Sequence, residues 1–462
     1  MSVHVVILAA GQGKRMMSDL PKVAHEAVGR SLVSWVLAAA RPLEASSTVV
    51  VVGHGADEVR RHLPDGVATA VQEQQLGTGH ATQVGLEALG EVDPSDTIMV
   101  LYGDTPLLTP QLLHELATLD RSETGRLISA HLDDPTGYGR VIRDASGAVT
   151  AVVEDRDCTP QQLEIDEINA GIYAVRAGSL IEALEEVSND NDQGEYYLTD
   201  VVGILVSKGD KLTAVEASPQ EVMGINSQDQ LAEARKELQR GTNQKLMESG
   251  VWMQDPDRTY IDDTVTVEPG ARIYPGVHLQ GSTTVAAGAQ VGPDVFAIDS
   301  SIGTDAIVWY AVLRSADVGD ECEVGPYASL RPGTVMERGS KIGTFVETKN
   351  TTLREGAKAP HQTYLGDAIV GARSNIGAGT VTCNYDGVQK SVTEIGEDAF
   401  IGSDTMLVAP LKIGNRATTG AGSVITRDVP DDALAVERSS QKEIPGYAER
   451  REMRKAAKKA KD

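Results

Sequence analysis

A glycine-containing loop near the start of the chain carries residues suited to binding a nucleotide phosphate. The apolar segment Val3–Leu8 runs into the sequence AAGQGKR at positions 9–15, and Arg15 and Lys22 add positive charge nearby. Glycines after a first strand let backbone N–H groups approach a phosphate. The loop lacks the third glycine of a dinucleotide fingerprint and does not match GxxxxGK[ST]. Alone, it is therefore compatible with a phosphate site or with an ordinary tight turn.

A carboxylate follows a second apolar segment in the same half of the chain. Asp104 comes directly after Thr97–Leu101 and the pair Tyr102-Gly103. Mg²⁺ is commonly held by one or two carboxylates together with substrate phosphates. A single aspartate here could equally cap a helix, but the glycine loop and its two cations belong to the same expected sheet edge. We therefore expect Asp104 to bind a metal ion.

The elements that position these residues have the pattern of an α/β domain. The segments Val3–Leu8, Thr48–Val52 and Thr97–Leu101 read as buried strands separated by helical pattern, as βαβ units require. Ligands bind at the carboxyl ends of such strands. Residues 226–250 are polar and place apolar side chains at helical spacing, so we expect a helix there that links two domains.

Apolar residues recur every six positions through much of the C-terminal half. One run is Val267, Ile273, Leu279, Val285 and Val291, and similar runs cover 318–342 and 395–425. This period fits neither a helix nor strand alternation. It is typical of a parallel β-helix, whose coils must stack to bury their apolar faces. Interruptions are expected at 343–369 and 382–394, and loops of this kind often carry function.

The expected domains are 1–225, the linker helix 226–250, and the β-helix with its tail, 251–462. The 462 residues carry a net charge of -25, which disfavours nucleic acid and anionic membranes as partners. Only three cysteines occur, no leader peptide is recognised, and no apolar run approaches the ~20 residues of a membrane span. We therefore expect a cytoplasmic protein, with a solvated basic tail at 450–462.

Several short motifs together resemble those of sugar-1-phosphate nucleotidylyltransferases. They are LAAGQGKRM, LPK, EQQLGTGHA and YGDTPL, followed by DPTGYGR and GEYYLTD. With the six-residue repeat, residues 3–440 resemble the bacterial bifunctional N-acetylglucosamine-1-phosphate uridylyltransferase/glucosamine-1-phosphate N-acetyltransferase family. The resemblance implies a Rossmann-like nucleotidyltransferase domain, a linker helix and a left-handed parallel β-helix. It also implies a homotrimer whose acetyltransferase sites form between subunits.

The same resemblance implies two reactions that lead to cell-wall and lipopolysaccharide precursors. Acetyl-CoA would acetylate glucosamine-1-phosphate, and the N-acetylglucosamine-1-phosphate formed would react with UTP and Mg²⁺ to give UDP-N-acetylglucosamine and pyrophosphate. Arg15 and Lys22 would supply positive charge for the triphosphate, while Asp104 and Asn226 would ligate Mg²⁺. The nucleotide-sugar site would comprise Leu8, Ala9, Ala10, Gly11, Lys22, Gln72, Gly77, Thr78, Tyr102, Gly103, Asp104, Gly139, Glu154, Asn169 and Asn226.

In the β-helix, the resemblance makes His361 the base that takes a proton from the sugar amine, and an imidazole that titrates near neutrality suits this role. Glu347 could orient or charge-balance that histidine. Gln362 stands where the family more usually has an aliphatic residue. The amino-sugar phosphate would be bound by Arg331, Lys349, Tyr364 and Asn375. Acetyl-CoA would be bound by Ala378, Asn384, Tyr385, Ser403, Ala421 and Arg438.

Two other functions are weighed against this one. The protein could be a one-site nucleotidylyltransferase whose β-helix only assembles or regulates, but His361, Lys349 and the pair Asn384-Tyr385 would then have no use. It could also be a non-catalytic scaffold. The joint presence of Arg15, Lys22, Asp104 and Asn226 argues against a scaffold.

Overall fold

The structure is a computed structural model that describes residues 1–11 and 13–460. The chain forms two compact units, one of Met1–Lys245 with Tyr260–Thr264, the other of Leu246–Thr259 with Val265–Asp462. Within the part that the structure describes, no helix has the length and apolarity needed to cross a membrane.

The first unit is built on a nine-stranded sheet, and the expected α/β fold is confirmed. Its main path runs in the order β11-β7-β10-β6-β1-β4-β5, and β10 is antiparallel to both of its neighbours in this path while the other pairings are parallel. The hairpin of β8 and β9 extends from β10. The bounds are β1 Val3–Ala9, β4 Ser47–Val52, β5 Ala68–Val71, β6 Thr97–Tyr102, β7 Gly125–His131, β8 Arg140–Arg143, β9 Val149–Val153, β10 Glu167–Arg176 and β11 Leu212–Glu216.

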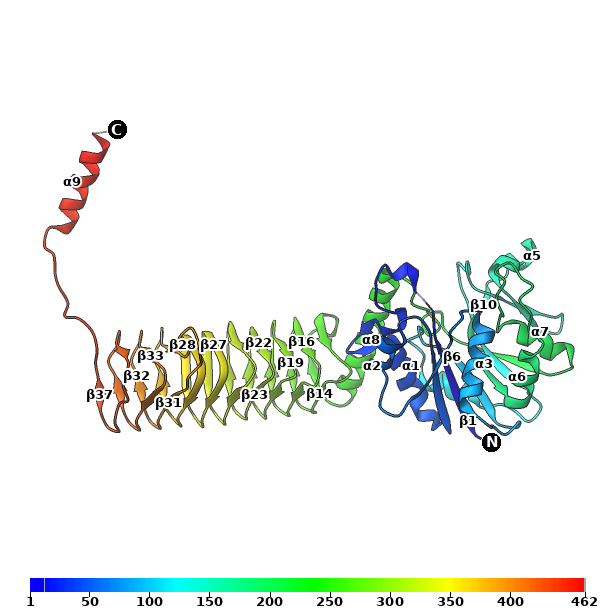
Figure 1. The fold of residues 1–462 in the computed structure, drawn as a ribbon, viewed down its shortest axis with the longest axis horizontal. Coiled ribbons are helices and arrows are strands. Elements are labelled where there is room, and N and C mark those ends of the chain that lie inside the picture. Colours follow the sequence, from blue (N-terminus) through cyan, green and yellow to red (C-terminus); the bar gives the residue numbers. More distant parts are fainter. Residues whose placement is uncertain (12, 461–462) are drawn as a thin grey trace. The chain divides into compact units, whose positions relative to one another are not determined.

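Helices cover both faces of this sheet (Figure 1). Side chains alternate between the faces of a strand, so Val5 and Ile7 of β1 face one core while Val6 and Leu8 face the other. The first core includes residues of α1 Leu32–Ala40, α2 Ala56–Arg61 and α4 Pro110–Ala117, and the second includes residues of α3 Thr78–Leu89, α6 Ala177–Leu184 and α7 Asp200–Ser207. Burial on both faces explains why the central strands are continuously apolar.

The helix expected at 226–250 is α8, Gln228–Glu248. Its apolar residues Leu231, Ala234 and Leu238 are buried in a cluster with Leu32 and Trp35 of the first unit. The apolar stripe of α8 therefore belongs to the core of the first unit, and the helix is more than a solvated connector. The domain boundaries as such stay a prediction.

The second unit is dominated by a parallel β-helix, as the six-residue period predicts. A 26-stranded sheet runs from β12 Trp252–Met253 to β37 Leu434–Ala435, and most strands pair with the third strand along, so that β14 Thr266–Val267 pairs in parallel with β17 Thr284–Val285. The coils lie side by side in Figure 1. All five residues of the run from Val267 to Val291 are buried. The sense of winding stays a prediction.

The interruption expected at 343–369 was wrong. β27 Lys341–Leu353 and β28 Lys358–Val370 pair in parallel from Lys341 and Lys358 to Leu353 and Val370, so the coil continues here. The repeat is hidden because buried threonines replace inward aliphatic residues. Thr351 Oγ1 donates to Leu365 O at 2.9 Å, and Thr348 Oγ1 lies 3.0 Å from Thr334 Oγ1. These hydrogen bonds satisfy the polar atoms inside the coil.

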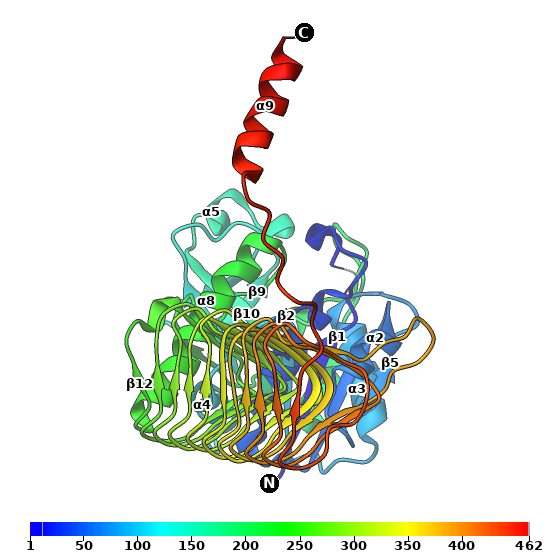
Figure 2. The same ribbon diagram turned by 90° about the vertical axis from the view of Figure 1, so that its left-hand side faces the viewer.

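The second expected interruption is a true loop. Asn375 of β29 Asn375–Ile376 pairs with Phe400, 25 residues later, whereas Lys358 pairs with Asn375, 17 residues on. The extra residues lie between β30 Val381–Cys383 and β31 Thr393–Ile395. Asp386 accepts hydrogen bonds from the backbone N–H groups of Val388 and Gln389 and so shapes the turn. Figure 2 shows the loop projecting beyond the stacked coils.

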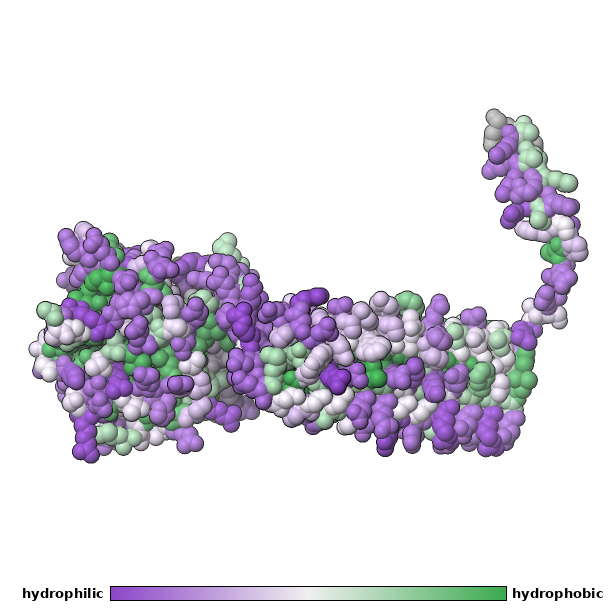
Figure 3. All heavy atoms as spheres, turned by 180° about the vertical axis from the view of Figure 1, so that it is seen from behind, coloured by the Kyte–Doolittle hydropathy of each residue, from purple (hydrophilic) through white to green (hydrophobic). Residues whose placement is uncertain are grey.

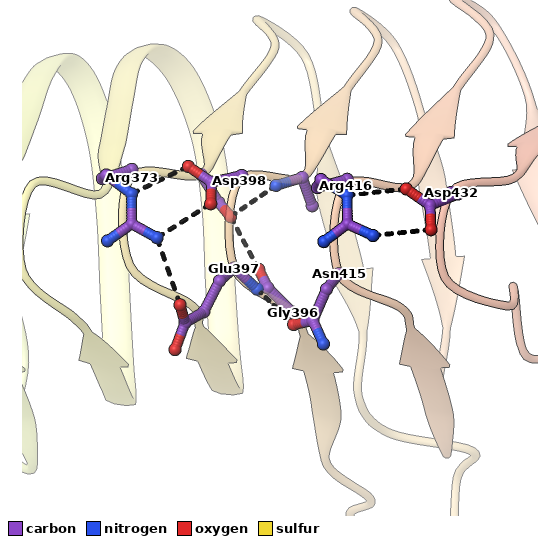
Figure 4. Close-up of polar contacts among 9 residues, drawn as sticks. Arg373, Gly396, Glu397, Asp398, Asn415, Arg416 and Asp432 are labelled. Carbon is purple, nitrogen blue, oxygen red and sulfur yellow. Dashed lines mark hydrogen bonds and ion pairs between the residues drawn. The ribbon is translucent and has the colours of Figure 1, made fainter.

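One corner of the last coils carries a ladder of charged residues (Figure 4). Arg373, Asp398, Arg416 and Asp432 all have left-handed backbone conformations, with φ between 53° and 60°. Arg373 Nε donates to Asp398 at 2.8 Å, and Arg416 Nε donates to Asp432 at 2.6 Å. Arginine and aspartate alternate from coil to coil at this corner, so each arginine pairs with an aspartate instead of facing a like charge. Hydrophilic side chains also gather along one edge of these coils in the rear view (Figure 3).

Candidate active sites

The loop after β1 lies at the carboxyl edge of the first sheet, where a ligand is expected. Gly103 N donates to Leu8 O at 2.9 Å, and Gln75 Nε2 donates to Ala10 O at 2.6 Å. A Cβ at Gly53 would lie 2.8 Å from the Ala10 carbonyl oxygen, so glycine is needed where the ends of β1 and β4 approach. The loops after β1, β4 and β6 therefore meet at one place. Gln12 lies outside the described residues.

Lys22, Asp104 and Asn226 converge at this edge from distant parts of the chain. Lys22 Nζ forms an ion pair with Asp104 and donates to Asn226 Oδ1 at 3.1 Å. Ile225 N donates to Asp104 O at 2.9 Å, which anchors the segment that carries Asn226. The Lys22 and Asp104 side chains are only 16% and 17% exposed. Two oxygen ligands thus point at one position that a positive charge occupies.

This donor set fits Mg²⁺, which prefers oxygen ligands and commonly takes one or two carboxylates plus phosphate oxygens. Within residues 1–11 and 13–460, no cluster of three or more His, Cys, Asp or Glu side chains is placed to hold a metal ion. A metal at Asp104 and Asn226 would therefore need further ligands, which a triphosphate can provide. The lysine ammonium stands here for the charge that such a metal would supply.

Arg15 lies on the short helix Lys14–Met16, close enough for its charge to act on Tyr138. Burial first, and then the charge of Asp104, raises the pKa of Tyr138, whereas the positive charge of Arg15 acts against this rise. Tyr138 was not among the residues expected from the sequence. Arg15 itself is exposed, as a group that meets a solvated phosphate would be.

A second cluster lines the same edge on the other side of β6. Gly171 has φ of 74°, and a Cβ there would lie 1.9 Å from the ring of Tyr102, so only glycine lets that ring pack against β10. Asn169 Nδ2 donates to Tyr173 OH at 2.7 Å, while the buried Asn169 Oδ1 has no partner among the described residues. Asn169 N also donates to Gly139 O at 2.8 Å. The site thus presents one unused amide oxygen.

Glu154 adds a carboxyl group to this cluster, and its surroundings disfavour the ionised form of that group. Its Oε1 accepts from Thr199 Oγ1 at 3.0 Å, and burial raises its pKa above the usual range. Burial, the charge of Glu154 and the charge of Asp104 also raise the pKa of Tyr102. Thr199, Gly171 and Tyr173 are residues that sequence reasoning missed. A glycine inside an apolar strand pattern is a signal that could have singled out Gly171.

The start of α3 brings together three residues of the expected nucleotide-sugar site. Thr78 Oγ1 accepts from Leu198 N at 3.1 Å, and a Cβ at Gly77 would lie 2.6 Å from Tyr196 O. Gln72 follows β5 and donates to Gly77 O at 3.1 Å. These contacts hold the glycine-rich start of α3 against the segment around Tyr196.

In the β-helix, four of the six residues expected to bind acetyl-CoA form a row along one edge, which begins at His361. Gly379 N donates to Gln362 O, Asp404 N to Ala378 O and Gly422 N to Ser403 O, so successive coils are in register there. Arg438 Nη1 donates to Ala421 O at 3.0 Å and extends the row. The row, in order along the stack, is His361, Ala378, Ser403, Ala421 and Arg438. The His361 side chain is exposed at its start.

Three cationic side chains of the β-helix, those of Arg331, Lys349 and Lys390, lie close together. Arg331 Nη1 pairs with Glu347 Oε1 at 2.8 Å, so the recorded partner of Glu347 is this arginine and not His361. The Lys390 ammonium group beside it, and then the charge of Arg331, lower the pKa of Lys349. Lys390, on the projecting loop, was missed because sequence spacing does not show where a loop folds back.

Asp367 holds this group together. Burial acts to raise its pKa, but hydrogen bonds from Asn350 and Asn384 and the charges of Lys390 and Lys349 hold the pKa below its usual range. Tyr364 lies beside Asn384, since both would meet a Cβ at Gly366 within 2.7 Å. The other expected residues are more dispersed: Asn375 belongs to β29 on a neighbouring side of the coil, and Tyr385 is exposed on the loop.

Comparison with known proteins agrees with this two-part geometry. Residues 5–198 match the model of the MobA-like NTP transferase domain, and residues 393–427 match that of the bacterial transferase hexapeptide (six repeats). The chain thus combines a nucleotidyltransferase domain with a hexapeptide acyltransferase domain, and the predicted two-site transferase is confirmed at this level.

Relatives match over nearly the whole chain. The bifunctional protein GlmU of Streptomyces avermitilis is 48% identical, over 99% of this chain and 96% of the relative. The GlmU proteins of Caldanaerobacter subterraneus and Stutzerimonas stutzeri are each 46% identical, over 96% and 97% of this chain and 97% and 99% of the relatives. The chain belongs to the bifunctional GlmU family.

Proposed function

We propose that this protein makes UDP-N-acetylglucosamine in two steps, acetylation of glucosamine-1-phosphate by acetyl-CoA and uridylyl transfer from UTP to the product. The observation that carries the proposal is the convergence of Asp104 and Asn226 on the Lys22 ammonium at the carboxyl edge of the sheet. A binding module would have little use for a carboxylate, an amide oxygen and a lysine cation at one point. Because its substrates UTP and acetyl-CoA are made there, we place the protein in the cytoplasm.

In the uridylyl transfer, a phosphate oxygen of the sugar attacks the α-phosphorus of UTP. A new P–O bond forms, the bond to the β-phosphate oxygen breaks, and pyrophosphate leaves. The protein needs no nucleophile, because positioning and charge neutralisation carry such transfers. Bound Mg²⁺ would neutralise phosphate charge at Asp104 and Asn226. Lys22 would leave Asp104 and bind the triphosphate instead, and Arg15 would add a second positive charge.

The sugar would lie beside the cluster of Tyr102, Glu154 and Asn169. The unpartnered Asn169 Oδ1 supports this placement, since a buried acceptor is costly until a ligand hydroxyl satisfies it. The carboxyl group of Glu154 offers a further polar contact, and the backbone of Gly139 would line the sugar site.

In the acetyl transfer, the sugar amine attacks the thioester carbonyl carbon. The N–C bond forms, the C–S bond breaks, and His361 takes the proton from nitrogen and returns it to the leaving thiolate. Arg331, Lys349 and Lys390 would bind the phosphate of the sugar. The mutual repulsion that lowers the pKa of Lys349 supports this role, because a phosphate dianion relieves it.

We propose that three copies assemble around their β-helices. Outward-pointing residues on one side of the coils are apolar in two stretches, which Ser329 and Glu347 separate, and apolar rows of this kind mark interaction surfaces. The residues are Phe296, Val312, Val381, Met406 and Val424. The projecting loop also carries Val388, whose side chain is 91% exposed in the single chain. Met406→Glu on this side should shift the mass in light scattering from trimer towards monomer.

A paired assay on the purified protein tests the function. One reaction holds glucosamine-1-phosphate and acetyl-CoA and is followed as free thiol. The other holds N-acetylglucosamine-1-phosphate, UTP and Mg²⁺ and is followed as pyrophosphate. Release of both products is expected. Pyrophosphate without thiol would mean that the β-helix is structural here, and the C-terminal site assignment would fall.

A further inference from the structure

Arg140, the first residue of β8, is buried although its side chain carries a permanent charge. It is only 2% exposed, and a guanidinium group keeps its proton in proteins. A buried charge is tolerated only where an opposite charge and hydrogen-bond acceptors surround it. The expected roles above include its neighbour Gly139 but give Arg140 none.

Two acceptors from different segments hold the guanidinium group. Arg140 Nη2 forms an ion pair with Asp155 Oδ1 at 3.2 Å, and Nη1 donates to the carbonyl oxygen of Tyr138. Nε is buried and has no partner among the described residues. Asp155 begins the short helix Asp155–Asp157, which follows β9. One side chain therefore ties the start of β8 to the segment after β9.

Each of these two segments carries a residue expected at the sugar. Gly139 lies between Tyr138 and Arg140, and Glu154 directly precedes Asp155. A Cβ built at Gly139 would lie 3.6 Å from Glu154 Oε2, so the two residues lie side by side. The guanidinium contacts therefore fix the chain on both sides of this pair.

A third expected residue is joined to the same point through the backbone. Arg140 pairs with Ile168 of β10, and Gly139 O accepts a hydrogen bond from the next residue, Asn169, at 2.8 Å. Asn169 also carries the buried amide oxygen that has no partner among the described residues. Arg140 thus stands where the segments of Gly139, Glu154 and Asn169 meet.

The geometry of these contacts suits arginine and not lysine. A guanidinium group is planar and reaches two acceptors with two separate nitrogen atoms in a fixed arrangement. An ammonium group supplies the same charge from one nitrogen atom. A lysine at position 140 would therefore keep the positive charge near Asp155 but lose the rigid link to Tyr138 O.

We propose that Arg140 is a positioning residue that holds Gly139, Glu154 and Asn169 in the geometry that binds the sugar of N-acetylglucosamine-1-phosphate. The inference rests on the proposed uridylyl transfer and deepens it. Arg140 acts through these neighbours, because its own side chain is enclosed. The loop after β1 and Lys22 belong to other segments, so binding of UTP does not depend on Arg140.

The test measures KM for N-acetylglucosamine-1-phosphate and KM for UTP separately. Arg140→Met fills much of the space but removes both contacts. We expect KM for the sugar phosphate to rise about tenfold, the scale of one lost hydrogen bond to a charged group, while KM for UTP is unchanged. A merely structural role would lower the melting temperature without changing the ratio of the two KM values.

Arg140→Lys separates geometry from charge and keeps the charge of Asp155 paired if the methionine variant folds poorly. Most of the rise in KM for the sugar phosphate should persist in this variant. A wild-type KM in Arg140→Lys would mean that the charge alone is needed, and the positioning role would be overturned.

Arg143→Met is the matched control, because Arg143 also lies on β8 and also pairs with a carboxylate, Glu167 Oε1, at 2.6 Å. This variant should keep both KM values. Calorimetry supplies a readout without turnover: Arg140→Met should bind UDP as the wild type does, but should bind UDP-N-acetylglucosamine about tenfold more weakly.

The failures are distinguishable. If the wild-type protein releases no pyrophosphate from UTP and N-acetylglucosamine-1-phosphate, the proposed function falls before Arg140 is considered. If the wild-type protein is active and both Arg140 variants keep its ratio of KM values, the inference about Arg140 is overturned while the proposed function stands.

Discussion

Lys22 forms an ion pair with Asp104, 82 positions away in the sequence, and the two side chains are mostly buried at the carboxyl edge of the sheet. Each group lowers the cost of burying the other. The same lysine reaches Asn226, so one cation joins two prospective metal ligands. Substrate and Mg²⁺ would replace these contacts with stronger ones. The resting site is therefore neutralised before the substrate arrives.

Replacing Lys22 should separate the two activities. Lys22→Met removes the charge that meets the triphosphate, and pyrophosphate release should fall by a factor of about 100 to 1,000, the scale for loss of one preorganised electrostatic group. Acetyl transfer should be unchanged, because the row of His361 belongs to the other unit. His361→Ala is the reciprocal variant, and loss of both activities in either folded protein would contradict separate sites.

Gly171 should be intolerant of a side chain for two reasons that a control can separate. Gly171→Ala combines φ of 74° with a contact of 1.9 Å to the Tyr102 ring, whereas Gly147→Ala has φ of 86° with open space around it. Left-handed backbone costs a non-glycine residue about 1 kcal/mol. Urea unfolding should show that cost for Gly147→Ala and about 2 kcal/mol more for Gly171→Ala. Equal losses would mean that the Tyr102 ring moves freely.

Removing the Glu154 charge should stabilise the protein at neutral and alkaline pH. Burial raises the folded-state pKa of Glu154, so folding favours the protonated carboxyl, and this contribution is lost as pH rises through the folded-state pKa. Glu154→Gln keeps the acceptor for Thr199 and should raise the melting temperature by about 2 °C at pH 8. The gain should vanish near pH 4, and an equal gain at both pH values would contradict the burial effect.

Lys390 should matter for the sugar phosphate and not for folding. Lys390→Ala removes one of three nearby cations, and KM for glucosamine-1-phosphate should rise about tenfold, on the order of one charged hydrogen bond. Relief of repulsion should also raise the pKa of Lys349. Lys412→Ala, which breaks the 3.2 Å ion pair with Glu394 elsewhere on the β-helix, is the matched control and should leave KM unchanged.

Much of this molecule could be predicted from local pattern. Apolar runs marked β1, β4 and β6 because central strands are buried on both faces, and the six-residue period marked the β-helix because each short side needs an inward residue. Where Thr348 and Thr351 replaced aliphatic residues, the period failed although the coil continued. A pattern of apolarity cannot see a buried hydroxyl that finds its partner in the next coil.

The sequence by itself determined which chemical groups are present and the two classes of fold that carry them, since apolar periodicity and glycine spacing are local properties. Only the tertiary structure decided which groups meet. It brought Lys390 to Lys349, closed the Tyr102 ring over Gly171, and turned the Gln72 amide towards His80. These contacts depend on the path of a loop, the register of paired strands and the orientation of side chains. All three are set by packing in three dimensions and cannot be read from residue type or spacing.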